Sequence, residues 1–394
     1  MGEKSVCRRD LLKVLGAGSV GTVVASGLGS VASAAPAGAT GAYQSVSDRK
    51  IRVGIVGYGV CRFGAAFGFQ NHPNVEVAAV SDLIADRRAG LMKACRCEKS
   101  YESLEVLVKD KTLDAVFVAT DAPSHAAHAM EVLRHDKDVM CAVPATFGSV
   151  ADGERLLETV RKTGRKYMMA ETTCYRPDCY AMRQVYRAGG FGRLTYSEGE
   201  YFHFFKTPLA SFKGWRIGLP PQWYPTHSMG YYVGVTGGRF TSVSCVGFRG
   251  KLPAFEPSAN RYKNPFSDEI ALLTTSEGGS SRMAVCWGVQ GYQGELGRVF
   301  GERGSMIGTR YQGPVKKLPR LTKPPLPKGM PGGGHGGSHG HLTDGFIRAI
   351  LTDGQPPVDI YDALALTVPG ILAHQSALRG GERLKIPQYA RPAP

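Results

Sequence analysis

A chain of 394 residues with 43% hydrophobic and 21% charged side chains can form two soluble globular domains with a sizeable core. The formal net charge is +15, but no basic run is interleaved with aromatic side chains, which excludes a nucleic-acid footprint. The charge indicates either an anionic substrate or surface, or a generally basic exterior that aids solubility.

The first 34 residues are predicted to be an export signal. The twin arginine Arg8-Arg9 precedes an apolar segment at 14–31, and residues 32–34 have the A-x-A form of a cleavage site. Five glycines weaken the apolar segment, so we expect no membrane anchor. The pattern resembles a twin-arginine signal, whose pathway exports folded proteins, and predicts a periplasmic or secreted protein. Residues 35–49 have the composition of a disordered linker.

Residues 51–82 have the pattern of a dinucleotide-binding unit. An apolar run predicts a buried parallel strand, glycines follow it at once, and a second apolar run ends in a carboxylate. The parts in order are a strand at 51–56, Gly57, Gly59 and Gly64, a small-residue helical segment, a strand at 75–80, and Asp82. The spacing of the third glycine differs from the usual pattern, so an ordinary glycine-rich turn is the alternative.

Each part of this unit has a chemical task. Gly57 permits a tight turn, Gly59 lets the backbone approach a pyrophosphate, and the following helix start offers free N–H groups. Asp82 lies 25 residues after Gly57, where its carboxylate can accept hydrogen bonds from both ribose hydroxyls. Since a carboxylate repels a 2′-phosphate, we expect NAD rather than NADP.

Further strands alternate with helices up to about residue 170. The pattern predicts an α/β fold with a doubly wound parallel sheet, in an NAD-binding domain at 50–170. Strands are expected at 114–120, 139–141 and 166–170, and helices at 83–95, 126–134 and 150–163.

Ligands of such sheets bind beyond the carboxyl ends of the strands. The candidate cofactor-binding residues are therefore Gly57, Tyr58, Gly59, Val60, Cys61, Arg62, Asp82, Thr120, Pro123, His125, Ala142, Val143, Pro144 and Glu171. A packing role at the start of a helix is the alternative for His125.

The second domain, predicted at 171–394, carries several strand candidates in sequence. They are residues 194–204, 242–248, 269–275, 282–287 and 298–300, and they indicate a mostly antiparallel sheet with one open face. That face could form a homo-oligomer interface or cover the active site. A helix at 359–379, capped by Asp359 and kinked at Pro369, could pack back on the first domain.

Three polar clusters at 171–175, 224–227 and 332–341 supply the candidate catalytic residues Tyr175, Tyr224, His227 and His335. Pro225 suits a first helical turn, which would place Tyr224 and His227 on one face. Histidine-rich tracts can bind metals, but no carboxylate or cysteine stands at ligand spacing, so we predict no metal site. Nine cysteines match no disulfide or zinc pattern, and we expect no obligatory disulfide.

The chain resembles the Gfo/Idh/MocA oxidoreductases over nearly all of its mature length. The shared features are the glycine turn, the strand end at 119–125, the loop at Pro144 and the second-domain sheet. The resemblance implies NAD-dependent hydride transfer on a sugar. The family usually has Glu-Lys-Pro at 142–144, and its lysine exchanges a proton with the substrate hydroxyl. Val143 cannot do this, so another group must take that proton.

The three polar clusters resemble a narrower group, the NAD-dependent glycosidases of glycoside hydrolase family 109. The matching residues are Met168, Met169, Glu171 and Tyr175, the segment 224–227, and the segment 333–337. The resemblance implies that Tyr175 removes the proton next to a transient ketone, and that His227 and His335 hold and polarise the sugar. Ala142 and Thr172 differ from the glutamate and asparagine usual in that group.

Three function classes follow for a carbohydrate ligand. The protein could be a net sugar oxidoreductase, a glycosidase that uses NAD in a closed redox cycle, or a non-catalytic sugar-binding protein that contains NAD. His227 is the candidate for the hydroxyl proton, because an ordinary imidazole pKa of about 6.5 suits a general base at neutral pH.

Overall fold

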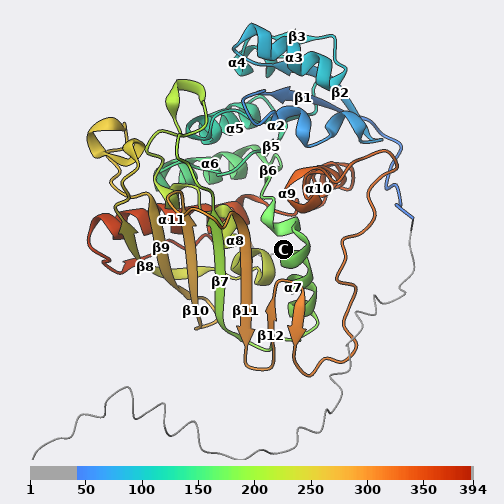
Figure 1. Cartoon of the computed structure of the whole chain (residues 1–394). Coiled ribbons are helices and arrows are strands. Elements are labelled where there is room, and N and C mark those ends of the chain that lie inside the picture. Colours follow the sequence, from blue (N-terminus) through green and yellow to red (C-terminus); the bar gives the residue numbers. More distant parts are fainter. Residues whose placement is uncertain (1–41, 392–394) are drawn as a thin grey trace, which may run out of the picture. The chain divides into compact units, whose positions relative to one another are not determined.

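Six parallel strands form the first sheet, in the order β3-β2-β1-β4-β5-β6 (Figure 1). Their bounds are β1 Ile51–Val56, β2 Val75–Ser81, β3 Ser100–Tyr101, β4 Ala115–Val118, β5 Asp138–Cys141 and β6 Tyr167–Met169. The order reverses between β1 and β4, as in a doubly wound sheet, so the predicted Rossmann topology is confirmed. The computed structural model describes residues 42–391, and the predicted signal and most of the predicted linker lie outside them.

Helices on both faces close the core of this sheet. They are α2 Phe63–Ala66, α3 Ala85–Cys95, α4 Leu104–Leu107, α5 His125–Arg134 and α6 Val150–Thr163, with a 3-10 turn, η2, at Ala122–Ser124. The helix expected after the glycine turn is a single turn, because Gly68 at φ 74° ends it and a 3-10 turn, η1, follows at Phe69–Asn71. A single turn aligns few peptide dipoles, so it contributes less positive potential at its start than a longer helix would.

The second sheet has eight strands in the order β13-β12-β11-β7-β10-β9-β8-β14. Their bounds are β7 Leu194–Phe202, β8 Phe240–Phe248, β9 Asp268–Thr275, β10 Ser280–Cys286, β11 Gly294–Gly301, β12 Ser305–Ile307, β13 Arg310–Gln312 and β14 Leu384–Lys385. Neighbouring strands pair antiparallel except β7 and β10, which pair parallel. The sheet is therefore mostly antiparallel, as predicted.

Helices cover one face of the second sheet (Figure 1). The helices of this part are α7 Pro177–Arg187, α8 Thr226–Thr236, α9 Gly334–Gly337, α10 His339–Leu351 and α11 Ile360–Leu378; short 3-10 turns are η3 Thr173–Tyr175, η4 Phe212–Gly214, η5 Pro221–Trp223, η6 Pro253–Phe255 and η7 Pro257–Ala259. A Cβ on Gly199 would lie 2.0 Å from the Ser228 carbonyl oxygen. This glycine lets the start of α8, with His227, lie directly on β7.

Two helices near the end of the chain connect the two sheets. Leu342, Phe346 and Ile347 of α10 share a core with β1 of the first sheet, a contact that the sequence did not predict. Helix α11 packs on β8 and also against α6 and β6, as expected for a helix that returns to the first domain. Asp359 caps α11, and the helix continues through Pro369 to Leu378.

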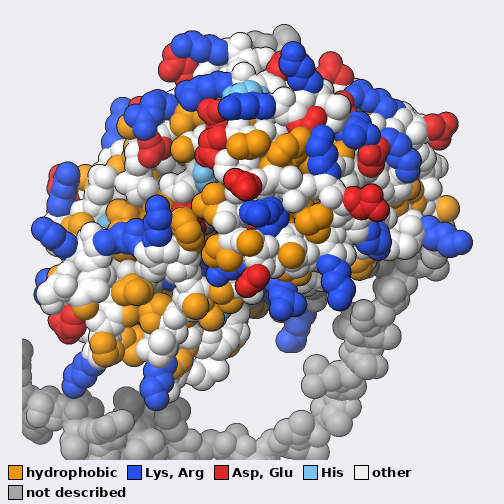
Figure 2. Space-filling model, turned by 90° about the horizontal axis from the view of Figure 1, so that it is seen from above, with side chains coloured by type: hydrophobic (Ala, Val, Ile, Leu, Met, Phe, Trp, Pro, Cys, Tyr) orange, Lys and Arg blue, Asp and Glu red, His pale blue; other side chains and the backbone are white. Residues whose placement is uncertain are grey.

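The other face of the second sheet is open. Leu272 and Val246 are 58% and 63% exposed on it, beside an ion-pair network of Glu198, Glu200, Arg282 and Arg298. On the face shown in Figure 2, basic side chains are spread among acidic and apolar ones. Among residues 42–391, all eight cysteines are free, and no helix is long and apolar enough to cross a membrane.

Candidate active site

A first cavity lies at the carboxyl ends of β1, β2 and β4, where the sequence predicts the cofactor. Gly57 adopts φ 103°, and a Cβ there would lie 2.4 Å from the Ala119 carbonyl oxygen, so this turn requires glycine. Asp82 is 9% exposed and accepts hydrogen bonds from the backbone N–H groups of Tyr58, at 2.7 Å, and Ile84, at 2.9 Å. These bonds fix the carboxylate at the end of β2, where the ribose of a dinucleotide lies.

The candidate cofactor residues divide between the cavities and the packing around them. The first cavity is lined by Gly57, Gly59, Val60, Cys61, Arg62, Asp82 and Thr120 of the predicted set. Tyr58 takes part through its backbone N–H. Pro123 lies in the turn η2. Ala142 and Val143 line a second cavity, described below, and their cofactor role stays a prediction.

His125 does not face either cavity. Its ring is 2% exposed, with Nδ1 2.9 Å from the carbonyl oxygen of Pro144 and Nε2 3.2 Å from that of Thr120. Both ring nitrogens are thus engaged by backbone groups of the β4 and β5 ends. The structure thus places His125 in the alternative packing role and outside the lining of both cavities. Pro144 takes part through that carbonyl and lines neither cavity.

The second cavity, of about 580 Å³, lies between the strand ends of the first sheet and the inner face of the second. It shares Cys61, Phe63 and Arg216 with the first cavity. Its other lining residues include Ala142, Val143, Thr172, Arg176, Tyr201, His203, Phe205, Tyr224, His227, Gln293, Glu295 and His335. Aromatic and cationic side chains therefore predominate in its wall.

His227, in the first turn of α8, is paired with a fully buried carboxylate. Its Nδ1 lies 3.0 Å from Oε1 of Glu171, which also accepts the N–H of Thr173 at 2.7 Å. Burial alone would lower the pKa of His227, but the carboxylates of Glu171 and Glu295 outweigh it and raise the pKa to about 9. The ring is protonated at neutral pH, so this charge state does not suit the predicted general base.

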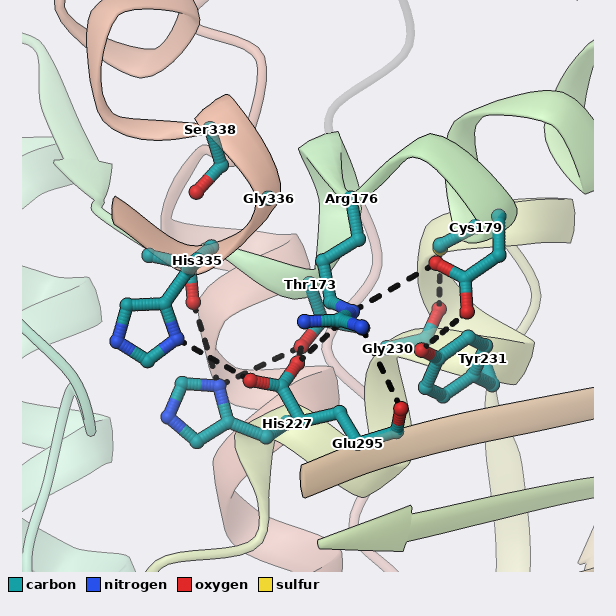
Figure 3. Close-up of polar contacts among 12 residues, drawn as sticks. Thr173, Arg176, Cys179, His227, Gly230, Tyr231, Glu295, His335, Gly336 and Ser338 are labelled. Carbon is teal, nitrogen blue, oxygen red and sulfur yellow. Dashed lines mark hydrogen bonds and ion pairs between the residues drawn. The ribbon is translucent and has the colours of Figure 1, made fainter. Parts of the chain in front are cut away.

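Glu295 forms a second carboxylate–histidine pair in the same wall (Figure 3). Its Oε1 lies 3.2 Å from Nδ1 of His335, and its Oε2 accepts the hydroxyl of Thr173 at 2.5 Å. Arg176 Nε lies 3.6 Å from the same carboxylate. Burial would raise the pKa of Glu295, but His227, His335 and Arg176 lower it to about 2. The carboxylate is thus ionised at any physiological pH.

Sequence reasoning missed Glu295 because the strand was expected only from residue 298. The structure starts β11 at Gly294, and alternate residues of that strand, Glu295, Gly297 and Val299, face inward. Alternate residues of a strand face the same side of the sheet. If the predicted strand had been extended four residues upstream, this alternation would have placed Glu295 on the inner face. Tyr201 of β7 was missed for another reason: its strand was predicted at 194–204, but nothing in the sequence marked this side chain as part of a site. Its ring centroid lies 4.6 Å from that of His227.

Tyr224 and His227 both line the second cavity, but Tyr224 precedes α8, which begins at Thr226, so the two do not share a helix face as predicted. Their ring centroids lie 5.7 Å apart. Burial raises the pKa of Tyr224 to about 12, against the opposing effect of the Arg216 guanidinium. The phenol is therefore a hydrogen-bond donor at neutral pH.

Tyr175 does not line the second cavity in this structure. The turn η3 directs its ring to the opposite side, where it stacks on His341 with centroids 5.9 Å apart. There it borders a separate cavity with Asp344 and Arg348. Burial raises the pKa of Tyr175, which does not favour a phenolate. Tyr175 therefore does not lie beside His227, where its predicted role as a base would require it.

The histidine-rich segment separates into different environments. His339 stacks on Phe67 with centroids 4.2 Å apart, and burial together with the charge of His335 lowers its pKa to about 4. Within residues 42–391 no three histidine, cysteine or carboxylate side chains are placed to hold a metal ion. Only His335 of this segment lines the second cavity.

Two family models match parts of this chain. Residues 51–171 match the model of an oxidoreductase family with an NAD-binding Rossmann fold, Gfo/Idh/MocA, and residues 326–393 match the C-terminal domain of glycosyl hydrolase family 109. Both resemblances are thereby confirmed. The first domain is an NAD-binding Rossmann domain, and the expectation of an NAD-linked enzyme is confirmed at that level.

Similar proteins extend the match along the chain. A glycosyl hydrolase family 109 protein of Solibacter usitatus is 26% identical, with 98% of this chain and 97% of the relative covered. Another such protein, of Stenotrophomonas maltophilia, is 23% identical over 86% of this chain and 89% of its own length.

Among solved structures, a levoglucosan dehydrogenase in complex with NADH and levoglucosan has a TM-score of 0.72 at 16% identity, covering 86% of this chain and all of the other. A scyllo-inositol dehydrogenase from Lactobacillus casei, with bound NAD(H) and scyllo-inositol, has a TM-score of 0.67, also at 16% identity and 86% coverage, with 99% of the other chain covered. At such identities these structures establish the fold alone.

Proposed function

We propose that this protein is an NAD-dependent enzyme that acts on a sugar or glycoside. The observation that carries the proposal is the connection between the two cavities, which share Cys61, Phe63 and Arg216. A dinucleotide in the first cavity would present its nicotinamide to the second. Tyr201, Tyr224 and the histidines there combine flat apolar faces with hydrogen-bonding groups, as sugar-binding cavities do.

The residues present fit NAD. The turn at Gly57 leaves no room for a side chain, which suits the passage of the backbone beside a pyrophosphate. The Asp82 carboxylate is held by two backbone N–H groups, yet its oxygens have further acceptor capacity for ribose hydroxyls. When bound, NAD would accept a hydride from a carbinol carbon of the sugar.

Between a net oxidoreductase and a closed redox cycle, the relatives favour the cycle. The match to glycosyl hydrolase family 109 covers the segment that carries His335, and Val143 lines the cavity where other oxidoreductases of this type have a lysine. In the cycle, a ring hydroxyl is oxidised, the adjacent C–H proton is removed and the aglycone leaves. Water then adds and the hydride returns.

The test is to incubate purified protein with p-nitrophenyl glycosides and with free sugars, following dye release and nicotinamide absorbance together. Dye release without net cofactor reduction supports the cycle, and stoichiometric reduction supports a net oxidoreductase. If neither signal appears although sugars bind, the protein is a non-catalytic sugar-binding protein and the proposal fails.

We also propose that the protein is exported through the twin-arginine pathway to the periplasm or beyond. The support is the sequence of residues 1–34 alone. Arg8→Lys combined with Arg9→Lys should hold the protein in the cytoplasm at precursor size. Normal export of that double variant would refute the proposal.

A second copy of the chain is the proposed occupant of the open sheet face. Leu272 and Val246 expose apolar surface there, next to paired charges that a symmetric partner could match. Leu272→Asp should convert an oligomer into single chains in light scattering. A wild-type protein that is already a single chain would refute this arrangement.

A further inference from the structure

We propose that His335, oriented by Glu295, takes the hydroxyl proton when the sugar is oxidised, while His227 acts beside it as a charged hydrogen-bond donor. The inference rests on the proposed function, because it concerns the same cavity. It gives the two histidines different tasks and makes Glu295 a positioning residue.

The geometry places both rings for action in the cavity. The imidazoles of His227 and His335 are nearly parallel, with centroids 5.6 Å apart and an interplanar angle of 13°. Nδ1 of His227 is turned to Glu171, and Nδ1 of His335 is turned to Glu295, the pair drawn in Figure 3. Each Nε2 is therefore the nitrogen left for the substrate. Phe63, which lines both cavities, lies 6.4 Å from the His335 ring, centroid to centroid. His335 thus stands close to the junction of the cavities.

The environments of the two rings differ in exposure and in charge. Glu171 is fully buried and its partner His227 is only 4% exposed, whereas the His335 side chain is 30% exposed. A proton on His227 is held by Glu171 and by the nearby charge of Glu295. Glu295 is shared with the Thr173 hydroxyl and Arg176, so its charge is divided among several partners. His335 is therefore the ring that is more exposed and that shares its carboxylate with more partners.

The backbone at His335 supports a chemical role. His335 adopts φ 49° and ψ 53°, the left-handed region, where a residue other than glycine costs about 1 kcal/mol or more. Glycines occupy 332–334 and 336–337, so the one residue with a side chain in this stretch stands in a conformation that glycine would adopt more easily. Lys323 Nζ donates to the carbonyl oxygens of Gly336 and Gly337, at 2.9 and 2.7 Å, and holds the loop in this form.

Five charged or titratable groups lie around His335, its carboxylate partner and its loop. They are Glu295 from β11, His227 from α8, His339 from α10, and Arg176 and Lys323, which contact its carboxylate partner and its loop. Glu295 is the only carboxylate among them, and it lies on the Nδ1 side. It can therefore hold Nδ1–H as the donor and leave Nε2 with a free lone pair.

The step balances with NAD as oxidant. The O–H bond of the sugar breaks and its proton goes to Nε2 of His335. With NAD bound, the C–H electron pair would leave as hydride to the cofactor, and the carbinol carbon would become a ketone carbon. The protonated His227 donates a hydrogen bond to a sugar oxygen and stabilises negative charge that develops there.

The main test is His335→Gly in the full chain loaded with NAD. Single-turnover cofactor reduction should fall by about 10²-fold or more, and added imidazole should restore it at least about tenfold by occupying the vacated space. The thermal stability should not fall, since glycine relieves the left-handed strain. Sugar affinity, measured by calorimetry, should change by less than about threefold.

Glu295→Gln tests the positioning role. It keeps an oxygen acceptor for Nδ1–H but removes the negative charge that favours a protonated ring. The rate of cofactor reduction should fall by about tenfold with little change in KM. The acidic limb of the profile of this rate against pH should move to lower pH. Glu269→Gln is the matched control, because Glu269 forms a buried pair with His374, at 2.6 Å, that lines neither cavity. It should leave the pH profile unchanged.

The outcomes separate this inference from the proposed function. If His335→Gly reduces NAD at the wild-type rate, or is inactive without rescue while still binding sugar, His335 is not the base. If the basic limb moves in Glu295→Gln instead, His335 donates a proton rather than accepting one. A wild-type protein that reduces no bound NAD with any sugar overturns the proposed function itself.

Discussion

The two cavities are built from different kinds of group. The first is made largely by backbone turns at the ends of neighbouring strands, with Asp82 as its principal acid at the end of β2. The second is made by side chains from segments as far apart as Thr172 and His335, and its chemistry depends on buried charge pairs. Backbone turns leave a local sequence pattern, whereas a charge pair becomes visible only when the chain is folded.

If the charge pairs set the chemistry of the second cavity, His227→Asn should have the largest effect. The amide cannot carry the positive charge that Glu171 maintains on the ring. We expect cofactor reduction to fall by about 10²- to 10⁴-fold with NAD affinity unchanged. Stopped-flow absorbance and calorimetry measure the two quantities. A loss below about tenfold would show that the cavity does not need this charge.

The pair of His227 and Glu171 should make the folded protein less stable at alkaline pH. The pKa of His227 is raised from about 6.5 in an unfolded chain to about 9, so the contribution is fully present below pH 6.5 and lost as pH rises through about 9. The loss should approach about 3 kcal/mol. Urea unfolding at pH 6 and pH 10 measures it. The decrease should be smaller in His227→Asn, and an equal decrease in both proteins would contradict the assignment.

For the first cavity, Gly57→Ala should weaken NAD binding by about ten- to a hundredfold, because the new Cβ would meet the Ala119 carbonyl in a left-handed turn. Gly164→Ala is a fitting control. Gly164 also has a positive φ, of 65°, but its Cβ would meet no atom within 4 Å. NAD retained per chain after gel filtration is the readout, and equal retention in both variants would contradict the steric account.

Asp82→Ala should have a smaller effect on the same cavity. Loss of a charge-assisted bond to the ribose should reduce NAD affinity by about tenfold and leave NADP affinity nearly unchanged. The ratio of the dissociation constants for NAD and NADP measures this change. Equal affinity of the wild type for both cofactors would contradict the predicted contact between Asp82 and the ribose.

Tyr175→Phe should have the smallest effect on cofactor reduction, within about twofold, because its ring lies outside the second cavity. Exchange of the adjacent sugar proton with deuterated water is the sharper measurement. If the variant reduces NAD but loses exchange, Tyr175 must enter the cavity when sugar binds. The position of the Tyr175 ring outside the second cavity would then apply only to the enzyme without sugar.

Sequence reasoning was accurate where chemistry is local. The strand β1 at Ile51–Val56, the turn at Gly57 and the carboxylate Asp82 follow from hydrophobic runs and glycine positions. His227 and His335 were found because each lies in a short unusual segment. The charge of His227 could not be predicted, since it depends on Glu171, 56 positions away in the sequence, and on Glu295, 68 positions away on strand β11.

The misses have physical causes of the same kind. His125 resembled a ligand because it follows a strand end, but the carbonyl of Pro144 from the next strand engages its ring. Glu295 and Tyr201 lie on strands whose inner faces become a cavity wall only when α8 packs across them. The strands β12 and β13 at one end of the second sheet were not predicted, since each has only three residues.

The position of helix α10 limits the order in which parts of the protein can fold during synthesis. Leu342, Phe346 and Ile347 complete a core with Ile51 and Val53, so the nucleotide-binding domain is not finished until nearly the whole chain has left the ribosome. The loop that carries His335 directly precedes this helix. Closing the core therefore also sets the last wall of the second cavity, and a chain truncated before residue 339 should lose both at once.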